Sequence, residues 1–164
     1  GVELQPTQHP NWVTTMPQTM QNIRALGSNW VILTPTWTYG SPSPLVLAPV
    51  PGKDSFWNDT YRMVTQARGL NMDVAFFPTP RFSSSADTFW ASAPKDENWW
   101  QAWFDHYQAF IINYADLAAQ SGVKTLILGG DWAYFWGDAA SQATLVGAGA
   151  RRFALAIQHN PLSE

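Results

Sequence analysis

The chain has 164 residues, a net charge of −3 with its histidines neutral, and no cysteine. Charged residues make up 13% of the sequence, about half the usual share, and 46% of the residues are apolar. This composition predicts a folded domain with a core, and it excludes a disulfide framework, a thiolate zinc site and a cysteine nucleophile. Nine Lys and Arg against twelve Asp and Glu leave no positive excess for phosphates, so we expect no nucleic-acid binding.

The compartment is suggested by several weak features together. No apolar run reaches the roughly 18 residues of a membrane helix, so no membrane span is expected. The low charge, the ten Trp, the absence of Cys and the triplet Asn58-Asp59-Thr60 fit a secreted or cell-surface protein. Because the first residue is Gly1 rather than Met, we expect the chain to be processed or cut from something longer.

Short apolar runs alternate with helical periodicity along the chain. Strands are predicted at 2–4, 30–33, 74–77 and 125–128, with the run 30–33 typical of a strand buried on both faces. Helices are predicted from Thr15 to Gly27, from Asp54 or Ser55 to Gly69, from Asp96 to Gly122, and over 146–157. A Pro-rich loop to Gly52 and a Ser-rich loop before Asp96 separate them. Trp99, Trp100 and Trp103 lie on an apolar helical stripe, which indicates core packing.

Four strand-then-helix units predict parallel strands joined by right-handed crossovers. An open doubly wound sheet and a (β/α)₈ barrel both use this pattern. No Gly-x-Gly-x-x-Gly or Walker loop follows a strand, whereas polar and aromatic residues follow every strand. Barrel enzymes build their sites from loops at the strand C-termini. The expected fold is therefore α/β of the TIM-barrel type, with about four βα units in one partial domain over residues 1–164.

The length is short for a barrel. A complete barrel needs about 250 residues, and four units alone leave bare strand edges and an uncovered apolar face. We therefore expect the chain to be the N-terminal half of a larger enzyme. The remainder of the same barrel, or a second copy of the chain, would complete the ring.

Two segments resemble a known group of enzymes. The stretch 20–31, running into Thr34-Pro35-Thr36-Trp37, resembles the first helix and second strand of clan A glycoside hydrolases, and family 113, the β-mannanase-like enzymes, is the nearest in character. The stretch 107–128 is similar to the segment before their fourth strand. The resemblance implies an acid/base Glu after an Asn at the end of that strand, where this chain reads Gly130-Asp131. The carboxylate is one methylene shorter and the Asn is missing, which implies modified chemistry or lost activity.

A glycosidase needs two carboxylates beside the scissile bond. Most acidic residues of the chain lie at predicted helix starts or on solvated helical positions, whereas Asp131 directly follows a strand and two glycines. We predict that Asp131 is catalytic, with a turn or cap residue as the alternative. The resemblance implies that the second carboxylate is a Glu on the seventh strand, in the missing half.

Aromatic and cationic residues after the strands are candidates for sugar binding. Flat rings stack on the C–H faces of sugars, so Trp37, Tyr39 and Trp132 are predicted to bind substrate, with simple loop packing as the alternative. Arg81 is a candidate to hold a sugar hydroxyl or keep a catalytic carboxylate ionised, and its alternative is pairing with a loop carboxylate. His9 joins the same set. Three dispersed histidines without an H-E-x-x-H motif give no reason to expect a metal, and no cofactor is expected.

The leading hypothesis is a glycoside hydrolase that acts on a polysaccharide or oligosaccharide. A second hypothesis, from a different class, is a catalytically inactive barrel that binds carbohydrate or holds a surface assembly together. A third is an open α/β domain with an unrelated ligand, which the strand order would distinguish.

Overall fold

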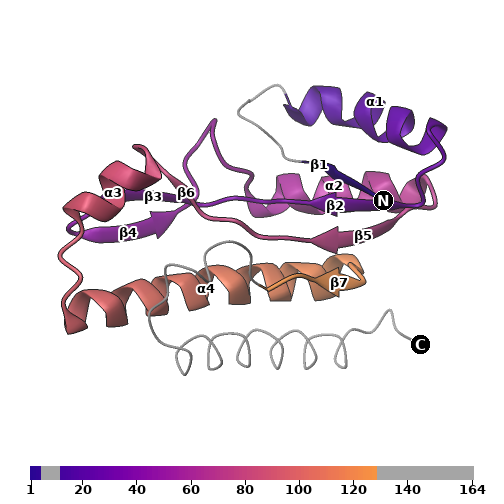
Figure 1. Ribbon diagram of the computed structural model, residues 1–164. Helices are drawn as coiled ribbons and strands as arrows, with labels where there is room; N and C mark the ends of the chain where they lie inside the picture. The colour runs from indigo at the N-terminus through magenta and orange to yellow at the C-terminus, as the bar shows by residue number, and fades with distance from the viewer. Residues whose placement is uncertain (5–11, 129–164) are drawn as a thin grey trace.

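A parallel sheet forms the centre of the computed structural model, which describes residues 1–4 and 12–128. Its strands are β1 (Val2–Leu4), β2 (Trp30–Leu33), β5 (Asp73–Phe76) and β7 (Thr125–Leu126), paired in the order β1-β2-β5-β7. Each strand therefore adds to the same edge as its predecessor (Figure 1). A doubly wound sheet reverses its strand order partway, and the described strands show no reversal. The parallel sheet and its sequential order are those of one part of a TIM barrel.

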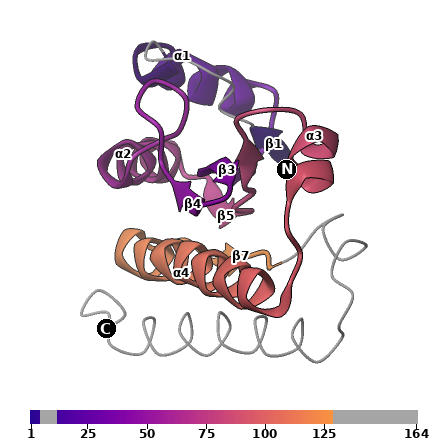
Figure 2. The same cartoon turned by 90° about the vertical axis from the view of Figure 1, so that its left-hand side faces the viewer.

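Three long helices connect these strands. They are α1 (Trp12–Ala25), α2 (Trp57–Gly69) and α4 (Glu97–Ser121). Viewed as in Figure 2, they form an arc around the strands, and α2 contacts both α1 and α4. This is the outer layer expected of a barrel. None of the helices in the described ranges is both long and apolar enough to cross a membrane.

Burial along β2 alternates from one face to the other. Val31 and Leu33 are buried in the core with Met16, Met20 and Met63, whereas Trp30 and Ile32 are partly exposed. The expectation that this strand is buried on both faces is therefore wrong for the part of the chain described. The second face of a barrel strand is covered by side chains from strands across the ring, and half of a ring supplies few of them.

The longest helix, α4, follows the predicted pattern. The Asp96 carboxylate accepts a hydrogen bond from Trp99 N at 2.9 Å, and Gly122 ends the helix with φ 75°. Its apolar stripe is buried, and Trp103 stacks on Tyr107 with ring centroids 5.2 Å apart. Trp99 and Trp103 are buried and Trp100 is partly buried, which confirms their packing role.

Two predicted loops contain regular structure. The Pro-rich segment forms the antiparallel hairpin of β3 (Thr38–Pro42) and β4 (Leu45–Ala48), because its Leu45-Val46-Leu47 run has the apolar character of a strand. The short strand β6 (Arg81–Phe82) pairs with β3. In the Ser-rich segment, Ser85 accepts a hydrogen bond from Thr88 N at 3.1 Å and begins α3 (Ala86–Ser92).

Helix α2 begins later than predicted. It starts at Trp57, and the residue before it, Phe56, donates its N–H to the Asp59 carboxylate at 3.3 Å. The prediction that Asp54 or Ser55 caps this helix is therefore wrong. Asp54 is instead engaged by a different segment of the chain, described below.

Three tyrosines lie in the core, namely Tyr39, Tyr107 and Tyr114. Burial raises the pKa of each phenol above its ordinary value of 10.0. The unfolded chain then loses these protons first as the pH rises. Their contribution to stability is complete below pH 10 and is lost as the pH rises from there toward the folded-state pKa.

We predict that the free energy of unfolding falls steeply above about pH 10, and that Tyr107→Phe makes this fall shallower by about 1.4 kcal/mol per pH unit. Denaturant unfolding of both proteins between pH 8 and pH 11 measures the two slopes. The matched control is Tyr61→Phe, because Tyr61 is exposed on α2. Equal slopes for the parent and Tyr107→Phe would contradict the claim that burial keeps the Tyr107 phenol protonated.

Candidate functional site

The segments that follow β2 and β5 stay hydrogen-bonded to each other beyond the ends of the two strands. Backbone N–H groups of the second segment donate to carbonyls of the first, in the pairs Phe77–Leu33 (2.8 Å), Thr79–Pro35 (3.1 Å), Arg81–Trp37 (2.7 Å) and Ser83–Tyr39 (2.9 Å). This rim ladder, residues 33–39 with 77–83, prolongs the sheet past its carboxyl edge. Two chain segments that the sequence presents as separate loops therefore form one surface.

Prolines are compatible with this rim ladder because of where they fall. The residues that donate to the first segment are 77, 79, 81 and 83. Pro78 and Pro80, which have no N–H, lie between these donors, at positions where the pairing requires no N–H. Pro35 contributes only its carbonyl. The strand predicted at 74–77 is therefore confirmed as an element, with a paired continuation that the two prolines do not interrupt. The third parallel strand ends at Phe76, but its pairing with the neighbouring segment continues.

Burial alternates along the second segment with the period of a strand. Phe76, Pro78 and Pro80 are buried, whereas Phe77, Thr79 and Arg81 are partly exposed. Since successive side chains of a strand point to opposite faces, Arg81 belongs to the exposed face, which we call the open face. Phe82 belongs to the other face and stacks on Tyr39, with ring centroids 5.6 Å apart.

Trp37 and Tyr39 lie on the side of the ladder that faces helix α4. The Trp37 ring is partly buried and contacts Phe110, with centroids 5.5 Å apart. The Tyr39 ring is fully buried and stacks on Trp103 at 6.1 Å. A ring with no exposed surface cannot stack on a sugar, so we do not carry Tyr39 into the proposed binding set. Trp37, in contrast, is only partly buried.

A buried carboxylate holds the segment that carries Trp37. Asp54 is only 4% exposed, and its two oxygens accept hydrogen bonds from Thr36 Oγ1 (2.6 Å), Thr38 Oγ1 (2.7 Å) and Val50 N (2.9 Å). The two threonines flank Trp37 in the sequence. Burial of a carboxylate is unfavourable unless it is hydrogen-bonded, and here three donors satisfy it. Asp54 therefore ties the loop after β4 to the rim ladder.

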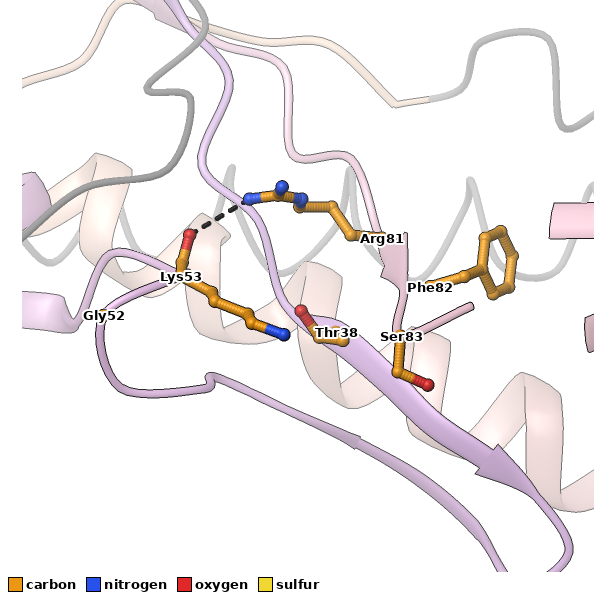
Figure 3. A pocket seen from close by; sticks show the side chains of 6 residues that line it. All are labelled: Thr38, Gly52, Lys53, Arg81, Phe82 and Ser83. Atoms are coloured by element: carbon orange, nitrogen blue, oxygen red, sulfur yellow. Dashed lines mark hydrogen bonds between the residues drawn. The ribbon is translucent and has the colours of Figure 1, made fainter. Parts of the chain in front are cut away.

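Arg81 lies at the open face, next to a pocket. Its Nη1 donates to the Lys53 carbonyl at 3.0 Å. The pocket has a volume of about 440 Å³ and is lined by Thr38, Gly52, Lys53, Arg81, Phe82 and Ser83 (Figure 3). Arg81 was predicted to lie at the site end of the sheet, and the structure places it beyond the carboxyl edge.

Three of the predicted site residues lie outside the described residues. They are His9, Asp131 and Trp132. The strand that leads toward Asp131, β7, ends at Leu126 on the edge of the sheet beside β5. Over residues 1–4 and 12–128, no three His, Asp or Glu side chains gather in a way that could hold a metal ion.

Two residues of this region were not singled out by the sequence. Asp54 was explained as a helix cap, because an Asp shortly before a helical pattern is the usual sign of one. Lys53 lies in a Pro- and Gly-containing stretch that reads as a loop. The sequence signal available for Asp54 was Thr36-Trp37-Thr38, whose two hydroxyls share one side of an extended segment and need an acceptor.

Asp54→Ala should lower the free energy of unfolding by about 3 kcal/mol or more, because three buried or partly buried donors lose their acceptor. Chemical denaturation measures the difference. Asp87→Ala is the matched control, since Asp87 is an exposed residue in the first turn of α3, and its loss should cost no more than about 1 kcal/mol. Equal losses in the two variants would show that the Asp54 contacts contribute little.

Comparisons with known proteins give a family and a fold. The model of Glycoside Hydrolase Family 113 matches residues 7–138. The GH113 β-mannanase AaManA from Alicyclobacillus acidocaldarius, in complex with ManMIm, is similar in structure, with a TM-score of 0.72 and 20% identity over 93% of this chain and 50% of that one. A comparison with curated proteins finds no match.

Two further solved structures agree with this fold. A complex of a GH113 β-1,4-mannanase has a TM-score of 0.74 at 14% identity, and a GH113 β-1,4-mannanase structure has a TM-score of 0.75 at 13% identity. Each match covers 93% of this chain and 52% of the other. The chain thus spans about half the length of the structures it resembles, which confirms the partial barrel. Because the family model covers most of its residues, the chain belongs to Glycoside Hydrolase Family 113.

Proposed function

We propose that this chain forms the first half of a TIM-barrel glycoside hydrolase that cleaves a polysaccharide of the β-mannan class. The observation that supports the proposal most is the family match, because it runs from residue 7 to residue 138 and so includes Asp131. The substrate class is suggested by the β-mannanases among the similar structures. A polysaccharide substrate also supports secretion or a place at the cell surface.

In this proposal Asp131 is the acid/base. Its carboxyl group donates a proton to the glycosidic oxygen while the bond from that oxygen to the anomeric carbon breaks. As that bond breaks, a second carboxylate either attacks the anomeric carbon, and water later displaces it, or takes a proton from the water that attacks the anomeric carbon directly. We assign that carboxylate to the remainder of the barrel, or to a second copy of the chain. Asp131 follows two glycines, which let the backbone approach a ligand closely.

The rim ladder supplies the sugar-binding surface. Arg81 lies on its open face, where a guanidinium can donate to sugar hydroxyls. Trp37 lies on the side of the ladder that faces α4, and we keep it in the proposed set because it is only partly buried; the two Thr–Asp54 hydrogen bonds hold its segment in place. His9 and Trp132 complete the proposed set on the basis of their positions after strands. No metal or cofactor takes part in the proposed reaction.

A second candidate is a carbohydrate-binding barrel without catalytic activity. The observation that favours it is the sequence Gly130-Asp131 at the place where clan A enzymes carry Asn-Glu. An Asp carboxylate reaches less far than that of a Glu, and Gly130 offers no side chain to the sugar 2-hydroxyl. Retained binding with lost hydrolysis would follow naturally from these two changes.

Replacing Asp131 with Asn in the full-length protein should lower kcat on soluble β-mannan by about 10²–10⁴-fold, because the Asn cannot donate the proton. Reducing-end release measures the rate. Asp87→Asn, on the exposed turn of α3, is the control and should keep the parent rate. An unchanged rate in Asp131→Asn would reject the assignment. Binding of mannan by a parent protein that shows no hydrolysis would select the second candidate.

A further inference from the structure

The pocket beside Arg81 is large enough for a ligand and lies where a substrate can reach it. Its volume of about 440 Å³ falls within the roughly 300–1,000 Å³ typical of small-molecule sites. Four of its residues, Thr38, Arg81, Phe82 and Ser83, come from the rim ladder, and Gly52 and Lys53 come from the loop after β4. Figure 3 shows the Lys53 side chain extending toward Thr38 and the Arg81 guanidinium reaching the Lys53 carbonyl.

The six described residues that line this pocket include two cations, Lys53 and Arg81, and no acidic side chain. Among residues 1–4 and 12–128, neither Arg81 nor Lys53 has a carboxylate within ion-pair distance, whereas Lys124 pairs with Asp73 at 2.8 Å. The nearest acidic side chain in the sequence is Asp54, which is buried and already accepts three hydrogen bonds. Two cations against this one anion leave a net charge of one positive.

Most of the hydrogen-bonding groups that the pocket still offers to a ligand are donors. The hydroxyls of Thr38 and Ser83 already donate, the first to Asp54 and the second to the Gly40 carbonyl. The Lys53 carbonyl already accepts from Arg81. A guanidinium has five N–H donors and an ammonium has three, so most of those on Arg81 and Lys53 stay available. A group that only accepts and carries negative charge matches them better than a neutral hydroxyl does.

We propose that this pocket binds the carboxylate of an acidic sugar unit, a uronic acid carried by the polysaccharide substrate. This inference rests on the proposed function, because it assigns a charged substituent to the substrate of the same cleft. The substituent would enter on the open face of the rim ladder, with its carboxylate between Arg81 and Lys53. The pocket would thus select an acidic mannan over a neutral one.

The test uses an acidic mannan oligosaccharide that carries glucuronate, and the same oligosaccharide after chemical reduction of its carboxyl group. Both are titrated into full-length Asp131→Asn protein, so that no hydrolysis interferes. We expect the acidic form to bind at least tenfold more tightly, and the preference to shrink in 0.5 M salt as charged contacts are screened. Lys53→Gln and Arg81→Gln should each reduce the preference by about tenfold.

Lys124→Gln is the matched control, because Lys124 is an exposed cation near the N-terminal end of β7 and should leave the preference unchanged. Lys53→Gln is also the variant whose folding should match that of the parent, because Lys53 is exposed and its side chain makes no described contact. Equal affinity for the acidic and reduced forms would overturn the carboxylate pocket and leave the proposed function standing. Failure of both forms to bind would reject the pocket together with the carbohydrate cleft.

Discussion

The parallel pairing of residues 33–39 with 77–83 is the constraint on which the rest of the structure depends. Its backbone hydrogen bonds extend the strand-like alternation of side-chain faces beyond the ends of the barrel strands. That alternation sends Arg81 to the open face and Phe82 to the packed face against Tyr39. Each bond contributes about 0.5–1.5 kcal/mol, and together they position side chains that would otherwise lie on independent loops. Asp54 adds a second tie, because it binds the threonines on both sides of Trp37.

The elements with strong periodicity could be predicted from the sequence. Helix α4 has a buried stripe, an Asp cap and a Gly end, and each of these signals is local. The strands β2 and β5 were equally clear, because their apolar runs follow helix-ending glycines. The hairpin of β3 and β4 was missed, since Pro and Ser in its neighbourhood are the usual signals of a loop, and the second partner of β3, the strand β6, is distant in the sequence.

The candidate site was predictable only in part, and for a physical reason. That polar and aromatic residues gather after barrel strands is a property of the fold, so Trp37 and Arg81 could be named. Which face each side chain takes depends on the pairing of two segments about 44 residues apart, which no local pattern encodes. Tyr39 was therefore taken as a binding residue although it belongs to the core, and Asp54 was taken as a helix cap although it is a buried acceptor.

The most direct test of this account is a crystal structure of the full-length Asp131→Asn protein with a bound manno-oligosaccharide. The account predicts sugar density at the carboxyl edge of the parallel sheet, on the open face of the rim ladder and within hydrogen-bond distance of Arg81. Density at the opposite end of the strands, near the Lys124–Asp73 pair, would contradict it.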